Sequence, residues 1–172
     1  MSPAPVTTTE RLVLRRVELD DAPFIMELVN EPGWLQYIGD KNVRSLDDAH
    51  RYLRSGPLDS YERHGFGLYL VQRRSDGEPI GTCGLIKRDA LDHPDIGFAF
   101  LARVGGQGYA YEAAAAVKRY AASLGVRTLL AITTPTNDRS QRLLGKIGLR
   151  FDREITMPPS TEVLHLFIAE LT

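Results

Sequence analysis

Residues 95–113 read DIGFAFLARVGGQGYAYEA and combine a strand, a glycine loop and the start of a helix. The segment 96–101 is apolar and rich in residues that favour β-structure. Glycines at positions 105, 106 and 108 follow it. Beyond them a helix is predicted, because one face at helical spacing carries Ala110, Ala113, Ala114, Val117, Ala121 and Leu124. Gly125 stands where the C-cap of that helix belongs.

The junction between the glycine loop and the helix predicts an anion-binding site. Backbone N–H groups in the first turn of a helix lack partners within the helix, and the positive end of the helix dipole lies there. Glycines let an anion approach these groups closely, so a pyrophosphate suits the site. A P-loop would need the pattern GxxxxGK[ST], which the sequence lacks. A Rossmann loop would need Gly or Ala where this chain has Tyr111, and a parallel strand before it.

The segments on either side of this stretch predict further strands and a helix. Alternating side chains at 66–72 and an apolar run at 80–86 flank the turn Ser75–Glu78, which indicates an antiparallel hairpin. After the central helix, 128–133 is typical of a buried strand. An amphipathic helix over 137–147, closed by Gly148, and a last strand over 163–168 complete the C-terminal part.

The N-terminal part predicts a strand and two helices. Residues 1–9 are rich in Pro and Thr and are expected to form a loose lead-in to a strand over 12–17. A helix starts at Asp20–Asp21 with Pro23 in its first turn, and Glu31-Pro32-Gly33 is expected to end it. Ser45 with Asp48 resembles a capping box, which opens a second helix through about Leu53. The order βααβββαβαβ has no repeats or linkers, so residues 1–172 are expected to form one mixed α/β domain.

Composition excludes several classes of protein. Hydrophobic residues make up 43% of the 172, which argues against disorder over most of the chain. Lys and Arg total 21 and Asp and Glu 22, so the net charge of -1 indicates no nucleic-acid or membrane partner. The four histidines are scattered and Cys83 is alone, so neither a metal site nor a disulfide is expected. The first residues lack a basic start and an apolar stretch, which favours a cytoplasmic location over secretion.

The glycine loop and its flanks resemble the acetyl-CoA motif of the GCN5-related N-acetyltransferase (GNAT) superfamily. Residues 106–113, GQGYAYEA, are similar to the form WGKGYATEA of its RimJ/RimL-type branch, the ribosomal-protein N-acetyltransferases. TERLVLR at 9–15, IGTCGL at 80–85, NDRS at 137–140 and LLGKIGL at 143–149 also match, in the same order. The likeness implies the GNAT fold, a mixed sheet whose strands splay around the acetyl-CoA site.

The resemblance implies roles for particular residues. The strand residues Phe98, Ala99 and Phe100 would pair with the pantetheine arm of acetyl-CoA, and Asn137 would bind its amide arm near the thiol. The pyrophosphate would be held by the loop and first helical turn, namely Gly106, Gln107, Gly108, Tyr109, Ala110 and Tyr111.

Some positions depart from the family pattern. Many superfamily members have a tyrosine acid where this chain has Leu144, whereas the RimJ/RimL-type branch uses a serine that matches Ser140. Gly105 replaces an aromatic or basic residue, which is expected to loosen the loop. Tyr111 replaces a threonine and is expected to put a bulky side chain near the phosphates.

The sequence offers few general bases. Asp95 and His93 precede the cofactor strand and could act directly or through water, or they could be a solvated strand-edge charge and a loop residue. Glu112 fits a helix-dipole interaction, and Cys83 fits a small buried apolar residue.

The acceptor side is expected, by family likeness, between the two early helices. Trp34 and Tyr37 lie there and would bind an amine or pack in the core. The resulting hypothesis is direct attack of an amine on acetyl-CoA in a ternary complex, without a metal, and the acceptor is a peptide or protein N-terminal α-amine. The alternatives are a small amine (amino acid, polyamine or antibiotic) as acceptor, or a non-catalytic acyl-CoA sensor. A homodimer is expected by analogy with relatives.

Overall fold

In the computed structural model, which describes residues 3–172, eight strands form one sheet in the order β1-β2-β3-β4-β5-β6-β8-β7. The strands are β1 Pro5–Thr8, β2 Leu12–Arg16, β3 Leu68–Arg73, β4 Pro79–Ile86, β5 Asp95–Phe100, β6 Thr128–Thr133, β7 Arg150–Ile155 and β8 Leu164–Glu170. Neighbours pair antiparallel except β5 and β6, which are parallel. The expected mixed α/β fold is confirmed.

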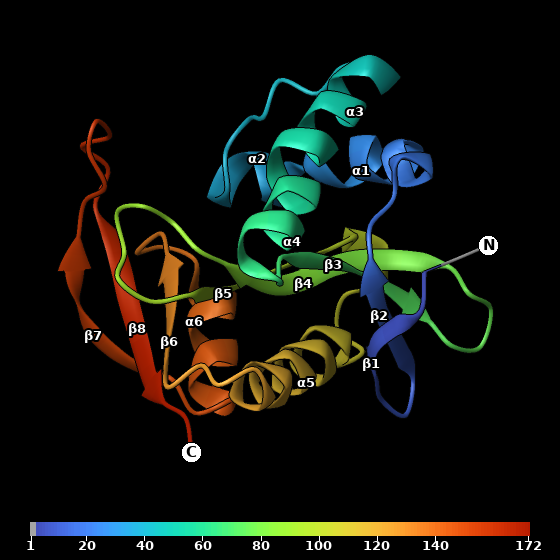
Figure 1. Ribbon diagram of the computed structural model, residues 1–172. Coiled ribbons are helices and arrows are strands. Elements are labelled where there is room, and N and C mark those ends of the chain that lie inside the picture. Colours follow the sequence, from blue (N-terminus) through green and yellow to red (C-terminus); the bar gives the residue numbers. More distant parts are fainter. Residues whose placement is uncertain (1–2) are drawn as a thin grey trace.

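Helices cover both faces of the sheet (Figure 1). They are α1 Ala22–Val29, α2 Pro32–Tyr37, α3 Leu46–Leu53, α4 Asp59–His64, α5 Tyr109–Ser123 and α6 Asp138–Lys146. The first four lie on one face, and α5 and α6 lie on the other. The main core fills the space between these layers and includes Leu14, Leu70, Leu85 and Val117. No helix in the described part of the chain is long and apolar enough to cross a membrane.

The N-terminal segment is more ordered than expected. Within the expected loose lead-in 1–9, Pro5–Thr8 forms β1 and pairs with β2, while residues 1–2 lie outside the described residues. Proline is tolerated at the first position of an edge strand and threonine favours β-structure, so this Pro/Thr-rich segment suits an edge.

The first helix ends close to the expected segment, but that segment also starts a helix that the sequence did not predict, which affects the site. Helix α1 ends at Val29, and Pro32 stands in the first turn of another helix, α2. Proline suits that position because its fixed φ is helical and the missing N–H has no partner there. Trp34 and Tyr37 therefore lie on a helix. The expected cap of α3 is confirmed, because the Ser45 side chain accepts a hydrogen bond from the Asp48 N–H.

Two further elements escaped the sequence pattern. The edge strand β7 is exposed along nearly its whole length, so no alternation of burial marks it. The short helix α4 follows α3 through a π-helical turn over Arg54–Leu58.

Gly84 makes the pairing of β3 with β4 sensitive to substitution. A Cβ built on Gly84 would overlap the backbone oxygen of Gly67, and backbone cannot move aside as a flexible side chain can. Gly84→Ala is therefore expected to destabilise the fold by about 3 kcal/mol, at the upper end of overpacking effects. Urea denaturation measures this change.

Gly145 provides the matched control. It lies inside α6 with open space around its Cβ position, so Gly145→Ala is expected to stabilise the fold by about 0.5–1 kcal/mol. Equal midpoints for the two variants would contradict the register of β3 and β4.

Candidate active site

The strands β5 and β6 diverge and open the sheet. They share one register pair, Asp95 with Leu130, next to a hydrogen bond of 2.9 Å from the Leu130 N–H to the Pro94 carbonyl. The other edge of β5 pairs with β4 along its full length. Beyond Asp95, the edge of β5 that faces β6 is thus left without a strand partner, and its backbone groups can pair with an extended ligand.

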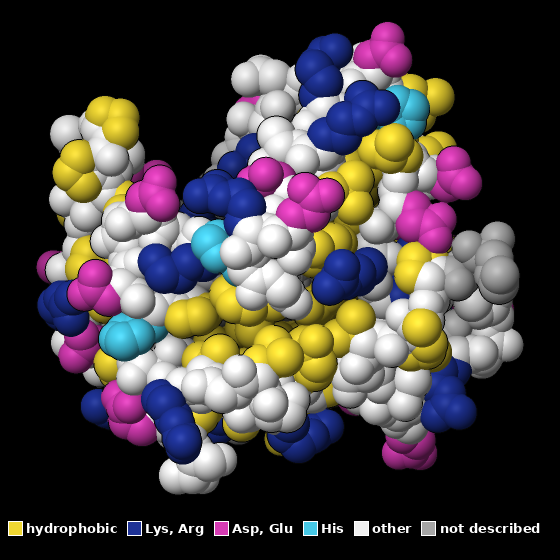
Figure 2. All heavy atoms as spheres, in the orientation of Figure 1, with side chains coloured by type: hydrophobic (Ala, Val, Ile, Leu, Met, Phe, Trp, Pro, Cys, Tyr) yellow, Lys and Arg dark blue, Asp and Glu magenta, His cyan; other side chains and the backbone are white. Residues whose placement is uncertain are grey.

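A cleft of about 1110 Å³ occupies this opening. Pockets for drug-sized ligands usually measure about 300–1,000 Å³, so the cleft suits a long ligand. Figure 2 shows hydrophobic side chains across the middle of this face. Phe98, Ala99 and Phe100, to which the resemblance assigns the pantetheine arm, line the cleft.

The glycine loop at one end of the cleft adopts the conformation that an anion site needs. Gly106 and Gly108 have φ values of +77° and +82°, which favour glycine. Gly108 is the N-cap of α5 and provides no side-chain cap, so the first-turn N–H groups are left for a ligand. Tyr109, Ala110 and Tyr111 also line the cleft.

Three residues of the glycine loop differ from what the resemblance to the family implied. Gln107 does not line the cleft, and its carbonyl instead accepts a hydrogen bond from Arg11. Tyr111 stands at the cleft edge with 46% of its surface exposed, so it leaves room beside the loop. A Cβ on Gly105 would lie 3.2 Å from the Ala102 carbonyl oxygen, which leaves little room for the family's larger residue.

The turn between β1 and β2 braces the glycine loop. Arg11 donates to Glu112 at 2.8 Å through Nε and to the Gln107 carbonyl at 2.9 Å through Nη1. Thr9 also donates to Glu112, and the Arg11 guanidinium stacks on the Tyr109 ring. Burial alone would raise the pKa of Glu112, but these hydrogen bonds lower it. Glu112 therefore does more than interact with the helix dipole, because it joins the loop to the N-terminal strands.

Removal of this brace is expected to weaken cofactor binding. Glu112→Ala frees Arg11 and the loop, so we expect the Kd for acetyl-CoA to rise about tenfold, the effect of losing a hydrogen bond to a charged group. Calorimetric titration measures it. Arg119→Gln, at an exposed position further along α5, is the control. An unchanged Kd in a folded Glu112→Ala protein would show that the contacts of Glu112 do not determine the conformation of the glycine loop.

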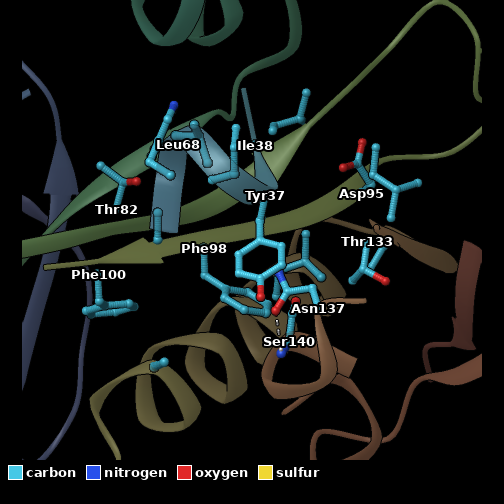
Figure 3. Close-up of a pocket in the computed structure, with 18 of the residues that line it drawn as sticks. Tyr37, Ile38, Leu68, Thr82, Asp95, Phe98, Phe100, Thr133, Asn137 and Ser140 are labelled. Carbon is cyan, nitrogen blue, oxygen red and sulfur yellow. Dashed lines mark hydrogen bonds between the residues drawn. The ribbon is translucent and has the colours of Figure 1, made fainter. Parts of the chain in front are cut away.

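The start of α6 brings Asn137 and Ser140 to the cleft. The Asn137 Oδ1 accepts from the Ser140 backbone N–H at 3.3 Å, so Asn137 is the N-cap, as drawn in Figure 3. Its side-chain amide N–H groups stay available to a ligand. The Ser140 hydroxyl forms no hydrogen bond within residues 3–172, although it lines the cleft. Leu144, one turn further on, is buried and apolar.

Asp95 is a buried carboxylate at the point where β5 and β6 part. It is 1% exposed, and Arg88 Nε donates to its Oδ1 at 3.1 Å. Burial raises the pKa of Asp95 to about 6, against the opposing charge of Arg88. The solvated strand-edge alternative is therefore wrong for Asp95. His93 is exposed and does not line the cleft.

Helix α2 provides the opposite wall. The Tyr37 side chain extends from α2 into the cleft, toward the side on which Asn137 and Ser140 lie (Figure 3). Trp34 lines the cleft but is buried in the core, so packing is its main contact. Cys83 is fully buried, and burial raises the pKa of its thiol.

Several residues at this site escaped the sequence analysis. Arg11 contacts Gln107, which is distant in sequence, and Arg88 contacts the buried Asp95. Lys41 reaches the cleft from a loop. Within residues 3–172, no three His, Cys, Asp or Glu side chains are grouped to hold a metal ion.

Comparison with known proteins agrees with this geometry. The acetyltransferase (GNAT) domain family matches residues 11–150, most of the chain. The chain belongs to the GNAT acetyltransferase family. It is 29% identical to an uncharacterized N-acetyltransferase, YoaA of Bacillus subtilis (strain 168), over 149 residues that cover 85% of this chain and 83% of that protein.

Solved structures share the GNAT fold. A RimL ribosomal L7/L12 α-N-protein acetyltransferase in complex with coenzyme A aligns with a TM-score of 0.83 and 16% identity, covering 98% of each chain. An acetyltransferase of Salmonella typhimurium, described as modifying the N-terminal serine of ribosomal protein L7/L12, aligns with a TM-score of 0.82 and 14% identity. It covers 98% of this chain and 100% of its own.

Family membership defines the general chemistry. GNAT enzymes use acetyl-CoA, and this chain is an acetyl-CoA-dependent N-acetyltransferase. Its own residues fit that ligand: a free strand edge for an extended arm, glycines at positive φ and an uncapped helix start for phosphates.

Proposed function

We propose that this enzyme acetylates the α-amine of a peptide or protein N-terminus. The observation that carries the proposal is the buried Asp95 carboxylate, with a pKa of about 6, at the point where β5 and β6 part. An α-amine has a pKa of about 7.7–8.0, whereas a lysine side chain has one of about 10.4. A carboxylate with this pKa is therefore better matched to an α-amine. The RimL-type fold neighbours, described as N-terminal acetyltransferases, support the same acceptor.

Different residues of the cleft have different roles in the proposed reaction. Acetyl-CoA, when bound, provides an activated acetyl group. The free edge of β5 and the Asn137 amide would hold its arm, and the glycine loop with the start of α5 would hold its phosphates. Asp95 accepts the proton of the attacking amine, directly or through a water. Ser140 Oγ donates a proton to the departing sulfur. Tyr37 orients the acceptor from α2.

Peptides with blocked and free N-termini test the acceptor. A peptide with a free α-amine and an internal lysine is incubated with the enzyme and acetyl-CoA, and fragment masses locate the acetyl group. We expect acetylation at the α-amine and none on the matched peptide with a formylated N-terminus. Acetylation of lysine in both peptides, or turnover of polyamines, amino acids or aminoglycosides alone, would overturn the proposal. The cytoplasmic location and the homodimer stay predictions.

A further inference from the structure

Arg88 presents unused hydrogen-bond donors to the cleft. It lies just after β4, and its Nε is fixed by the buried Asp95 at 3.1 Å. The Nη1 and Nη2 groups donate no hydrogen bond within residues 3–172, and 35% of the side chain is exposed. Arg88 lines the cleft. A guanidinium held at one end with its planar fork free is a preorganised receptor for a carboxylate.

Lys41 places a second cation on the same cleft. It lies in the loop after α2, lines the cleft, and pairs with no carboxylate of the described chain. The neighbouring Asp40 is already paired with Arg44. Lys41 is exposed and lines the same cleft as Arg88, and desolvation followed by the charge of Arg88 lowers its pKa. Like charges brought together in a partly desolvated cleft are unfavourable unless an anion joins them.

Asp95 pairs with Arg88 through Nε only, and the other charges nearby within residues 3–172 form no ion pair with Lys41 or with the free end of Arg88. The Lys87 ammonium donates hydrogen bonds to the carbonyls of Arg88 and Leu91. Arg63 and Asp59, on α4, pair with each other. Glu162, on the loop opposite, lines the cleft and forms no ion pair with described residues. Figure 2 shows Lys and Arg side chains, with some Asp and Glu, in the notch between the β7–β8 hairpin and the helices.

We propose that Arg88 and Lys41 bind a carboxylate carried by the acceptor close to its reactive amine. The inference rests on the proposed function and names its substrate class more closely. Because Arg88 is bonded to Asp95, an anion held by its free fork lies beside the amine that Asp95 deprotonates. The acceptor would be a peptide with an acidic residue at its first or second position. A free α-amino acid also has a carboxylate next to its amine, and the experiment distinguishes an amino acid from an acidic peptide as the acceptor.

Matched peptides that differ in one charge test the site. Ser-Asp and Ser-Asn peptides, identical beyond the second residue, are compared by kcat/KM together with free serine and aspartate. We expect the acidic peptide to be preferred about tenfold, mainly through KM, as a charge-assisted hydrogen bond predicts. Lys41→Met is expected to remove most of the preference and Lys41→Glu to reverse it. Arg54→Gln, an exposed cation away from the cleft, is the control and keeps the preference.

Arg88→Lys provides a second variant with the charge retained. A lysine lacks the planar fork, so the preference for the acidic peptide is expected to fall while the dependence of kcat on Asp95 ionisation persists. Equal kcat/KM for the acidic and amide peptides, or an unchanged preference in Lys41→Met, would overturn the inference and leave the proposed function intact. Faster turnover of free amino acids than of either peptide would assign the carboxylate to an amino acid.

Binding separates failure of the inference from failure of the proposed function. If neither peptide is acetylated, the proposed function fails, and calorimetry with the coenzyme A complex then measures peptide binding directly. Tighter binding of the Ser-Asp peptide, lost in Lys41→Met, would still support the anion site. Equal binding of both peptides would overturn it.

Discussion

Asp95→Asn is expected to lower kcat by about 100-fold or more, the range for removal of a general base. The substitution preserves size and removes the charge to which the proposed mechanism assigns the proton of the amine. Asp95 lies away from the glycine loop, so the Kd for acetyl-CoA should stay within about twofold of wild type. Asp92→Asn, at an exposed position in the loop before β5, is the control and should leave kcat unchanged.

The pH dependence gives this prediction a second readout. The pKa of Asp95 is raised to about 6, so the carboxylate accepts a proton above that pH and is protonated and inactive below it. Activity of the wild type should rise through pH 6 on an acid limb that belongs to the enzyme. Asp95→Asn should lose this limb and keep only the ionisation of the acceptor amine. A variant that keeps both its rate and the limb near pH 6 would show that Asp95 only neutralises Arg88.

Ser140→Ala is expected to lower kcat by about 100-fold near neutral pH, as removal of a general acid does. Leu144 offers no proton, and the proposed mechanism therefore assigns the protonation of the departing sulfur to the Ser140 hydroxyl, which lines the cleft. The helix cap survives the change, because Asn137 accepts from the backbone N–H of residue 140. Acetyl-CoA affinity should therefore hold.

A leaving thiolate needs less protonation as pH rises. A thiol has a pKa of about 8.5, so the deficit of Ser140→Ala should shrink above that pH. A purely structural defect would show the same deficit at every pH, and that outcome would remove Ser140 from the mechanism. Ser123→Ala, at the exposed end of α5, is the control for the loss of a serine hydroxyl.

The central elements could be predicted because local signals agree there. The bounds of β6 match the expected 128–133, and α6 starts after its Asn137 cap and ends before Gly148. Glycine spacing indicated the loop before α5, and its positive φ values explain why those positions are glycine. In these segments pattern, cap and turn chemistry point to one structure.

The remaining features depend on contacts between distant residues. The contact of Arg11 with Gln107 spans 96 positions, and no local pattern marks it. Asp95 is buried where it pairs with Leu130 and contacts Arg88, so the sequence alone left it open as a base or a solvated strand-edge charge. Proline at 32 suits both the end of one helix and the start of the next, which hid α2.

Acceptor-dependent release of coenzyme A tests the central claim most directly. The enzyme is mixed with acetyl-CoA and peptides bearing free N-termini, and free thiol and acetylated peptide are measured in the same samples. The cleft between β5 and β6 predicts one coenzyme A released per peptide acetylated, little release without acceptor, and saturable acetyl-CoA binding. A folded protein that binds no acetyl-CoA, or binds it and acetylates no amine of any class, would contradict the account.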